Sequence, residues 1–198
     1  KQKKSGKMGY SFNDNLTFGT EKENIAVNYL CREMGFEFIG GDVNGKIVGS
    51  SRIEQICKCS YVPIKEFKYG SRLEFKDENG NIVIVTMPDK LLQKKSTLKL
   101  RWMEVKSTRN PLGAVLEISK KRIDSYNKVE YYSGVPVYIV MVENALEGWG
   151  CVNLKFTTPK EVIECNPSSF EDLGDEYRID FRYLPSINKK PISADDYK

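Results

Sequence analysis

Apolar residues near the start of the chain recur with the spacing of a helix. Between Thr20 and Met34 they occupy positions 25, 26, 27, 29, 30 and 34, which predicts an amphipathic helix. We expect Thr20 to cap this helix, with Glu23 at the capping-box position, and Gly35 to end it. Residues 36–42 then have the pattern of a short strand that enters a turn.

Residues 71–86 have the pattern of a hairpin. An Asn79-Gly80 pair favours a tight turn, and the β-branched run over residues 82–86 predicts a buried strand after it. The segment before the hairpin, residues 43–70, is ambiguous. We expect it to be an insertion that contains a helix at 51–58.

Residues 98–106 alternate between apolar and polar positions with period two. On a strand, this spacing places Glu104 and Lys106 on the same face. We expect this strand to be the hairpin partner of residues 82–86, because only a short polar stretch separates the two. Such a pairing would bring Asp89 close to Glu104.

The second half of the chain adds further strands around one helix. We expect a short strand that leads into a helix near Ser119, a central apolar strand at 134–144, another strand at 148–156, and an edge strand at 176–184. A helix, strands, a helix and strands in this order predict a three-layer α/β sandwich around a central mixed sheet.

With 198 residues, the chain has the length of one domain. We expect that domain over residues 19–185, with a flexible N-terminal arm at 1–18 and a loose tail at 186–198. The sequence has no apolar run of the roughly 18 residues needed to span a membrane and no apolar signal peptide. We therefore expect a cytoplasmic or otherwise intracellular protein, the nucleus included, with no membrane partner.

Residue composition excludes several kinds of site. The chain has five cysteines in no CxxC spacing and no histidine, which removes the usual ligands of a zinc site and predicts free thiols. Catalysis by histidine is excluded too, so acid–base chemistry is left to carboxylates, lysines or metal-bound water.

Positive charge is concentrated in one part of the chain. Residues 90–128 contain eleven Lys and Arg against three Asp and Glu, a net charge of +8 in a chain whose total is +4. A solvated lysine-rich surface would explain this, but so would a face that binds a polyanion.

A Glu-x-Lys pattern occurs three times, at residues 66–68, 74–76 and 104–106. The third copy differs because it lies on the alternating strand, follows a Pro-Asp pair and precedes a basic helix. Two carboxylates and a lysine on neighbouring strands are either a solvated sheet surface or a cage for a divalent cation.

Five stretches carry a resemblance to a known family: GTEKENIAVNYLCREMGFEFIGG, MPD, MEVKST, LEISKKRIDSY and GVPVYIVMV. In this order they resemble the PD-(D/E)xK, or restriction-endonuclease-like, nuclease superfamily across roughly residues 17–143. The resemblance implies an αβββαβ restriction-endonuclease-like core, to which this chain adds C-terminal strands.

The resemblance also implies roles for individual residues. Asp89, Glu104 and the Val105 carbonyl would bind Mg²⁺ or Mn²⁺, and Lys106 would orient or activate the attacking water. The family's first-helix glutamate would fall on Glu23, with Glu21 as the second candidate. Basic side chains expected to hold nucleic-acid phosphates are Lys94, Lys95, Arg109, Lys120, Lys121 and Arg122.

These patterns predict a divalent-metal-dependent endonuclease that hydrolyses phosphodiester bonds in DNA. Two alternatives stay open: a catalytically inactive nucleic-acid-binding or assembly domain of the same fold, and an RNA-cleaving endonuclease of the cap-snatching kind. The pattern does not decide between a monomer and a homodimer or larger assembly.

Overall fold

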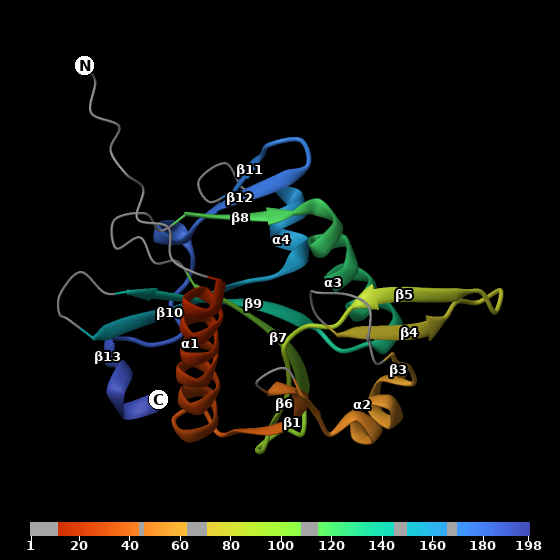
Figure 1. The fold of residues 1–198 in the computed structure, drawn as a ribbon, viewed down its shortest axis with the longest axis horizontal. Coiled ribbons are helices and arrows are strands. Elements are labelled where there is room, and N and C mark those ends of the chain that lie inside the picture. The colour runs from red at the N-terminus through yellow and green to blue at the C-terminus, as the bar shows by residue number, and fades with distance from the viewer. Residues whose placement is uncertain (1–11, 44–45, 63–70, 108–114, 145–149, 166–169) are drawn as a thin grey trace.

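The computed structural model describes residues 12–43, 46–62, 71–107, 115–144, 150–165 and 170–198. At its centre is a seven-stranded mixed sheet, which Figure 1 shows running across the molecule. Its strands are β1 (Phe36–Val43), β2 (Lys46–Val48), β6 (Lys90–Lys94), β7 (Leu100–Ser107), β9 (Val137–Asn144), β10 (Cys151–Thr157) and β13 (Ile192–Ser193). Their order in the sheet is β13-β10-β9-β7-β6-β1-β2.

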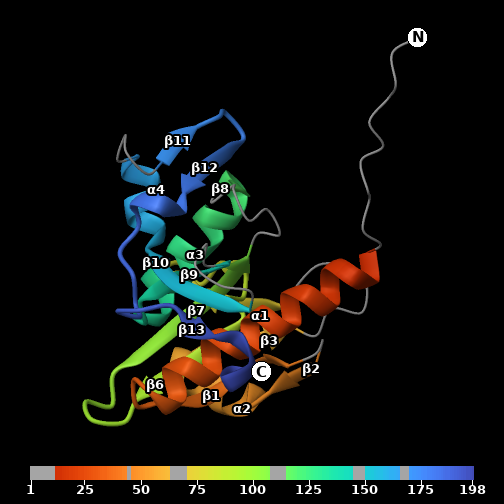
Figure 2. The ribbon, with the colours of Figure 1, turned by 90° about the vertical axis from the view of Figure 1, so that its left-hand side faces the viewer.

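The helices flank this sheet in two layers (Figure 2). One face is covered by α1 (Phe12–Arg32) and the opposite face by α2 (Ser50–Cys57), α3 (Lys120–Ser133) and α4 (Pro159–Glu164). Two short 3₁₀ helices, η1 (Phe181–Tyr183) and η2 (Ala194–Tyr197), lie near the C-terminus. Among the described helices, none is long and apolar enough to cross a membrane.

The alternation along β7 separates the two hydrophobic cores. Trp102 belongs to the core under α3, whereas Met103 and Val105 belong to the core under α1. The same alternation on β9 assigns Ile139 to the first core and Val140 to the second. A central strand that is apolar on both sides is buried by helices on both faces, as the sequence predicts.

The order α1-β1-β6-β7-α3-β9 confirms the expected αβββαβ core. β1 pairs with β6 and β6 with β7 in antiparallel ladders, while β7 and β9 are parallel. The connection between these parallel strands runs through α3, which packs back on the sheet. The chain is therefore a mixed α/β protein of restriction-endonuclease-like architecture.

An insertion between β2 and β6 carries α2 and a small sheet of three strands. These are β3 (Ser60–Val62), β4 (Arg72–Lys76) and β5 (Ile82–Thr86), which confirms the predicted hairpin and the helix near 51–58. Gly80 has the positive φ of 80° that such a turn needs, and the Asp77 carboxylate accepts the backbone N–H groups of Asn79 and Asn81.

A second small sheet holds β8 (Val115–Ser119), β11 (Phe170–Asp172) and β12 (Glu176–Asp180). The expected edge strand at 176–184 is wrong in this respect, because β12 pairs with β11 on one side and with β8 on the other. Alternation along a strand reports which faces are buried, and it carries no information about how many neighbours the strand has.

The hairpin partner of β7 also differs from the prediction. β7 pairs with β6, and the strand over residues 82–86 belongs to the insertion. Sequence patterning misses β6 because Leu91 and Leu92, which are neighbours on opposite faces, are both fully buried. A five-residue strand buried on both faces shows no alternation.

The first helix begins at Phe12, eight residues before the predicted start, so Thr20 lies inside the helix and does not cap it. Residues 12–18, expected in a flexible arm, are therefore helical. The low helix propensities of Asn13, Asn15 and Gly19 conceal this extension. At the other end, α1 stops two residues earlier than predicted, and Gly35 follows with a positive φ of 63°.

The C-terminal residues pack on the rest of the domain, where the sequence predicts a loose tail. β13 pairs with β10, and η2 packs on α1, where the rings of Tyr197 and Tyr29 meet edge to face at 5.4 Å. The Lys198 ammonium lies 3.1 Å from the Glu21 carboxylate. The pattern of charges along this segment reflects its position on the surface and does not indicate disorder.

Candidate active site

Asp89 lies where β6 stops pairing with β7. The pairing ends at Lys90, the first residue of β6, which lies opposite Met103. Past this pair, the backbone N–H of Val105 on β7 has no partner on β6. It donates to Oδ2 of the Asp89 carboxylate at 2.8 Å. The N–H and C=O of one strand residue point to the same side, so the Val105 carbonyl also points toward Asp89.

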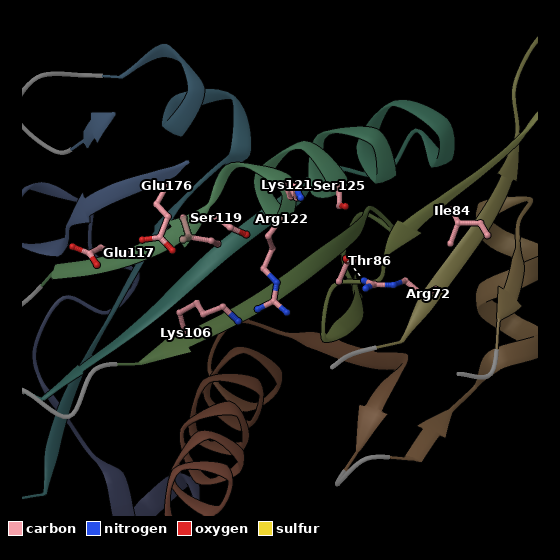
Figure 3. A pocket seen from close by; sticks show the side chains of 11 residues that line it. Arg72, Ile84, Thr86, Lys106, Glu117, Ser119, Lys121, Arg122, Ser125 and Glu176 are labelled. Atoms are coloured by element: carbon pink, nitrogen blue, oxygen red, sulfur yellow. Dashed lines mark hydrogen bonds between the residues drawn. The ribbon is translucent and has the colours of Figure 1, made fainter. Parts of the chain in front are cut away.

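Glu104 and Lys106 project from β7 to the same face, as the alternation predicts. Glu104 is 2% exposed, and the Lys106 ammonium contacts its Oε1 atom. The same ammonium lies 3.5 Å from the Val105 carbonyl oxygen. A second cation comes from α3, where Arg122 Nη1 lies 3.9 Å from Glu104 Oε1. Figure 3 shows the head groups of Lys106 and Arg122 converging.

Glu23 approaches the site from α1. Its Oε2 is 3.0 Å from the ammonium of Lys90, which also donates to the Asp42 carbonyl and is only 5% exposed. Burial, and then the charge of Glu104, are the main causes that raise the pKa of Asp89, and the negative charge of Glu23 adds to them. Asp89 just before β6, Glu104 of β7 and Glu23 of α1 are thus close together in the interior of the sheet, where β6 and β7 stop pairing.

The two central carboxylates have opposite electrostatic environments. Burial, and then the charge of Glu104, raise the pKa of Asp89 to about 8. Burial also disfavours the charged form of Glu104, but Lys106 and Arg122 outweigh it and hold the pKa of that carboxyl below its usual value. Burial opposes the charge on Lys106 as well, and Glu104 and Asp89 outweigh it, so the pKa of the ammonium is raised.

The oxygen atoms at this site are those that Mg²⁺ and Mn²⁺ prefer, namely carboxylates and a backbone carbonyl. Asp89 and Glu104 repel one another, as the raised pKa of Asp89 indicates, and a divalent cation would relieve that repulsion. Among the described residues, however, no group of three or more Asp, Glu, Cys or His side chains is arranged to hold a metal ion. The donor chemistry fits a metal, with two carboxylates and the carbonyl of Val105 rather than three side chains.

The residues expected to hold phosphates are divided between two places. Lys121 and Arg122 line a cleft beside Lys106. Lys94 and Lys95 lie at the other end of β6, where the Lys94 ammonium donates to the Met34 carbonyl and stacks on Phe36.

The Lys120 ammonium is 2.6 Å from the Asp172 carboxylate and lies over the Tyr177 ring, away from the lining of the cleft. Arg109 lies outside the described residues. Of the five predicted phosphate-binding side chains within the described residues, two therefore lie at the site.

Three residues near the site were missed by sequence patterning. Lys90 holds Glu23, and Arg72 and Thr86 of the insertion line the cleft beside Lys106. Because Lys90 directly follows Asp89 in the sequence, its position near the site could have been predicted. Nothing in the sequence connects Arg72 with Lys106, because only the packing of the insertion against α3 brings them together.

Tyr126 lies beneath the site and is fully buried, so it is not available to stack on a nucleotide. Burial, and then the charge of Glu104, raise the pKa of its hydroxyl well above the usual value. Trp102, on the same face of β7, is likewise fully buried in the core. All five cysteines are free thiols, as expected.

Comparisons with known proteins find no relative by sequence and only a weak likeness among solved structures. The sequence matches no family model, and no curated protein is significantly similar to it. Among solved structures, the chain is similar to Hjc, a Holliday junction resolvase from the archaeal hyperthermophile Archaeoglobus fulgidus, solved at 1.6 Å resolution. The two share 11% identity with a TM-score of 0.37, over 69% of this chain and 86% of the resolvase chain. A likeness this weak carries no argument for an activity.

Proposed function

We propose that the chain is a divalent-metal-dependent endonuclease that cleaves phosphodiester bonds in DNA, with a site of the PD-(D/E)xK type. The observation that carries the proposal is the convergence of Asp89 with Glu104 and Lys106, through the hydrogen bond from the Val105 N–H to the Asp89 carboxylate. This contact places two carboxylates, a carbonyl and an ammonium at one break in the sheet.

The residues would divide the work as follows. Asp89, Glu104 and the Val105 carbonyl would hold Mg²⁺ or Mn²⁺, which when bound supplies a Lewis acid and lowers the pKa of a water molecule. Lys106, released from Glu104, would place its positive charge at the phosphate under attack. Glu23 would act from α1 as a further carboxylate at the edge of the site, held by Lys90.

Arg122 would contribute a second positive charge opposite Lys106. Its guanidinium is half-buried and lies 3.9 Å from Glu104, so it can neutralise charge that develops on the phosphate without moving far. Two cations and a metal would balance a phosphate that gains negative charge in the transition state. Histidine is not required for this chemistry, in agreement with its absence from the sequence.

One observation favours the catalytically inactive alternative. Lys106 and Arg122 already neutralise Glu104, and the Lys106 ammonium lies between that carboxylate and the Val105 carbonyl. A lysine that stayed in this position would compete with a metal ion for the same oxygen atoms. The alternative is therefore a nucleic-acid-binding domain in which the lysine takes the place of the metal.

The test is single-turnover cleavage of labelled substrates with Mg²⁺, Mn²⁺ or EDTA. Duplex DNA, a four-way junction, single-stranded DNA and RNA are each incubated with the wild type and with Glu104→Gln and Lys106→Gln variants. We expect metal-dependent cleavage of at least one DNA substrate, and a fall in rate of about 10² or more in each variant, the scale of one lost electrostatic contact.

Glu143→Gln is the matched control, because Glu143 forms a half-buried pair with Lys155 at 3.5 Å elsewhere in the sheet. Its cleavage rate should stay near that of the wild type. Binding of DNA without cleavage under any metal would support the inactive domain instead. Cleavage of RNA alone would support the cap-snatching-like alternative.

A further inference from the structure

A polar cleft of about 740 Å³ adjoins the candidate site (Figure 3). Lys106, which belongs to β7, is one of the residues that line the cleft. The N-terminal half of α3 forms one wall, with Lys121, Arg122 and Ser125. The opposite wall comes from the hairpin of β4 and β5 in the insertion, which is not part of the αβββαβ core.

The hairpin is fixed in position by its inner face. Leu73, Phe75 and Val85 are almost fully buried in the core shared with α3. The Phe75 ring stacks on Tyr132 of α3, with centroids 5.5 Å apart and ring planes at 21°. The hairpin and α3 therefore pack on one shared core, which fixes the hairpin as the second wall of the cleft.

The cleft is lined by four cations, Arg72, Lys106, Lys121 and Arg122, and by the acidic Glu117 and Glu176. Lys106 and Arg122 are paired with Glu104, which leaves Arg72 and Lys121 to hold a polyanion. Glu117 is neutralised by Arg178 at 3.0 Å. Arg72 donates to the neutral hydroxyl of Thr86, and within the described residues neither Arg72 nor Lys121 forms an ion pair with an acidic side chain. Arg72 comes from the hairpin and Lys121 from α3, so these two cations lie on different walls of the cleft that Lys106 also lines.

On the outer face of the hairpin, β4 presents Arg72, Glu74 and Lys76, and β5 presents an apolar row beside them. Ile82, Ile84 and Thr86 alternate onto this face of β5, and the two isoleucines are 60% and 57% exposed. Ile84 lines the cleft, whereas Ile82 lies beyond it. Exposed β-branched side chains beside cations match a nucleic-acid strand, in which apolar sugar and base edges alternate with phosphates.

We infer that the hairpin of β4 and β5 is a DNA-binding wall of the cleft. Arg72 and Lys121 hold phosphates of the strand next to the one attacked at Lys106, and Ile84, two residues before Thr86 on β5, contacts a sugar or base of that strand. This inference rests on the proposed function, because it takes the strand bound in the cleft to be the strand that is cut.

The test measures binding of a fluorescent DNA duplex and of a fluorescent four-way junction by anisotropy, in EDTA, over a range of salt concentrations. The slope of the logarithm of affinity against the logarithm of salt concentration reports the number of phosphates bound. Each phosphate contact that is lost should reduce its magnitude by about 0.9. We expect Arg72→Gln and Lys121→Gln each to lower the slope by about that amount. Arg52→Gln, a matched change on the exposed surface of α2, should leave it unchanged.

Ile84 is tested against Ile82 on the same face. Ile84→Ser should weaken binding several-fold at every salt concentration without changing the salt slope, because it removes an apolar contact and no charge. Ile82→Ser should have little effect on affinity. Circular dichroism and melting temperature are compared for all variants, and the glutamine and serine changes are at surface positions that leave the core intact.

The outcomes separate the two proposals. If the wild type cuts DNA while Arg72→Gln, Lys121→Gln and Ile84→Ser bind like it, the hairpin is not a wall of the DNA site and this inference alone fails. If these variants weaken binding but the wild type cuts no substrate, the cleft binds DNA and the proposed nuclease fails. If the wild type binds no nucleic acid, both fail.

Discussion

Asp89 and Glu104 are two carboxylates of one site whose pKa values are shifted in opposite directions. Glu104 is paired with Lys106 and Arg122, so its charge is stabilised despite burial. Asp89 has one backbone N–H from Val105 and no cation within contact distance in the described part of the chain, so burial and the neighbouring negative charge raise its pKa. This difference makes Asp89 the residue whose ionisation a metal ion would change most.

In the metal-free protein, we predict that Asp89 lowers stability as the pH rises. Its folded pKa of about 8 lies above the unfolded value of roughly 4. The folded state therefore binds the proton more tightly, and the free energy of unfolding falls between about pH 4 and pH 8. Urea denaturation across this pH range measures the free energy of unfolding. This free energy should fall less with pH in Asp89→Asn than in the wild type.

The same variant tests the metal. Mg²⁺ or Mn²⁺ should raise the melting temperature of the wild type near pH 8, because the cation would offset the charges of Asp89 and Glu104. Asp89→Asn should show little or no rise, and Glu143→Gln should respond like the wild type. A full metal response in Asp89→Asn would place the metal elsewhere.

At the scale of the elements, the position of Asp89 depends on how closely β1 approaches it. The backbone N–H of Asp42 donates to the Asp89 carbonyl at 2.9 Å. Gly41 has a φ of 143°, and a Cβ at this position would overlap the Asp89 carbonyl oxygen and lie 2.9 Å from Lys90 Cα. Only glycine allows this contact between β1 and the start of β6.

We predict that Gly41→Ala destabilises the protein by at least about 1 kcal/mol and lowers the rate of cleavage, because the backbone at Asp89 must move. Gly19→Ala is the control. Gly19 lies within α1 with nothing within 4 Å of an added Cβ, so alanine there should stabilise the protein by about 0.5–1 kcal/mol.

Denaturation measures the stability of both glycine variants, and single-turnover cleavage measures their rates. If Gly41→Ala retains wild-type stability and rate, the close contact does not position Asp89. If both glycine variants are destabilised equally, the effect at Gly41 is not specific to the site.

At the scale of the whole molecule, the C-terminal segment supports the helix that carries Glu23. Ala194 is 5% exposed, and Ile187, Ile192 and Tyr197 pack against the core under α1. The side chain of Asn28 on this helix donates to the Tyr197 carbonyl at 2.8 Å. The segment is therefore part of the packing that sets the position of α1 over the sheet.

We predict that ending the chain after Pro185 lowers the melting temperature by about 5–10 °C. Loss of two or more packed apolar side chains removes about 2–4 kcal/mol of burial, and about 1 kcal/mol corresponds to about 2–4 °C at this chain length. Differential scanning calorimetry measures the change. Tyr197→Phe, which keeps the ring, should change it little, and an unchanged melting temperature on truncation would support the loose tail expected from the sequence.

Local patterns in the sequence were sufficient for much of the architecture. The period-two alternation placed Glu104 and Lys106 on one face of β7, and the apolar run at β9 indicated a strand buried on both sides. The Asn79-Gly80 turn and the start of α3 were also readable. These features depend on neighbours in the chain, so periodicity and turn chemistry report them directly.

Only the tertiary structure decided what lies beside those elements. The partner of β7, the long N-terminal part of α1 and the docking of the C-terminal segment all depend on contacts between residues far apart in the chain. The same holds for Lys90 beside Glu23 and for Arg72 across from Lys121. A sequence determines which side chains a strand or helix presents, but long-range packing determines which of them meet, and the candidate site with its cleft is assembled at that second step.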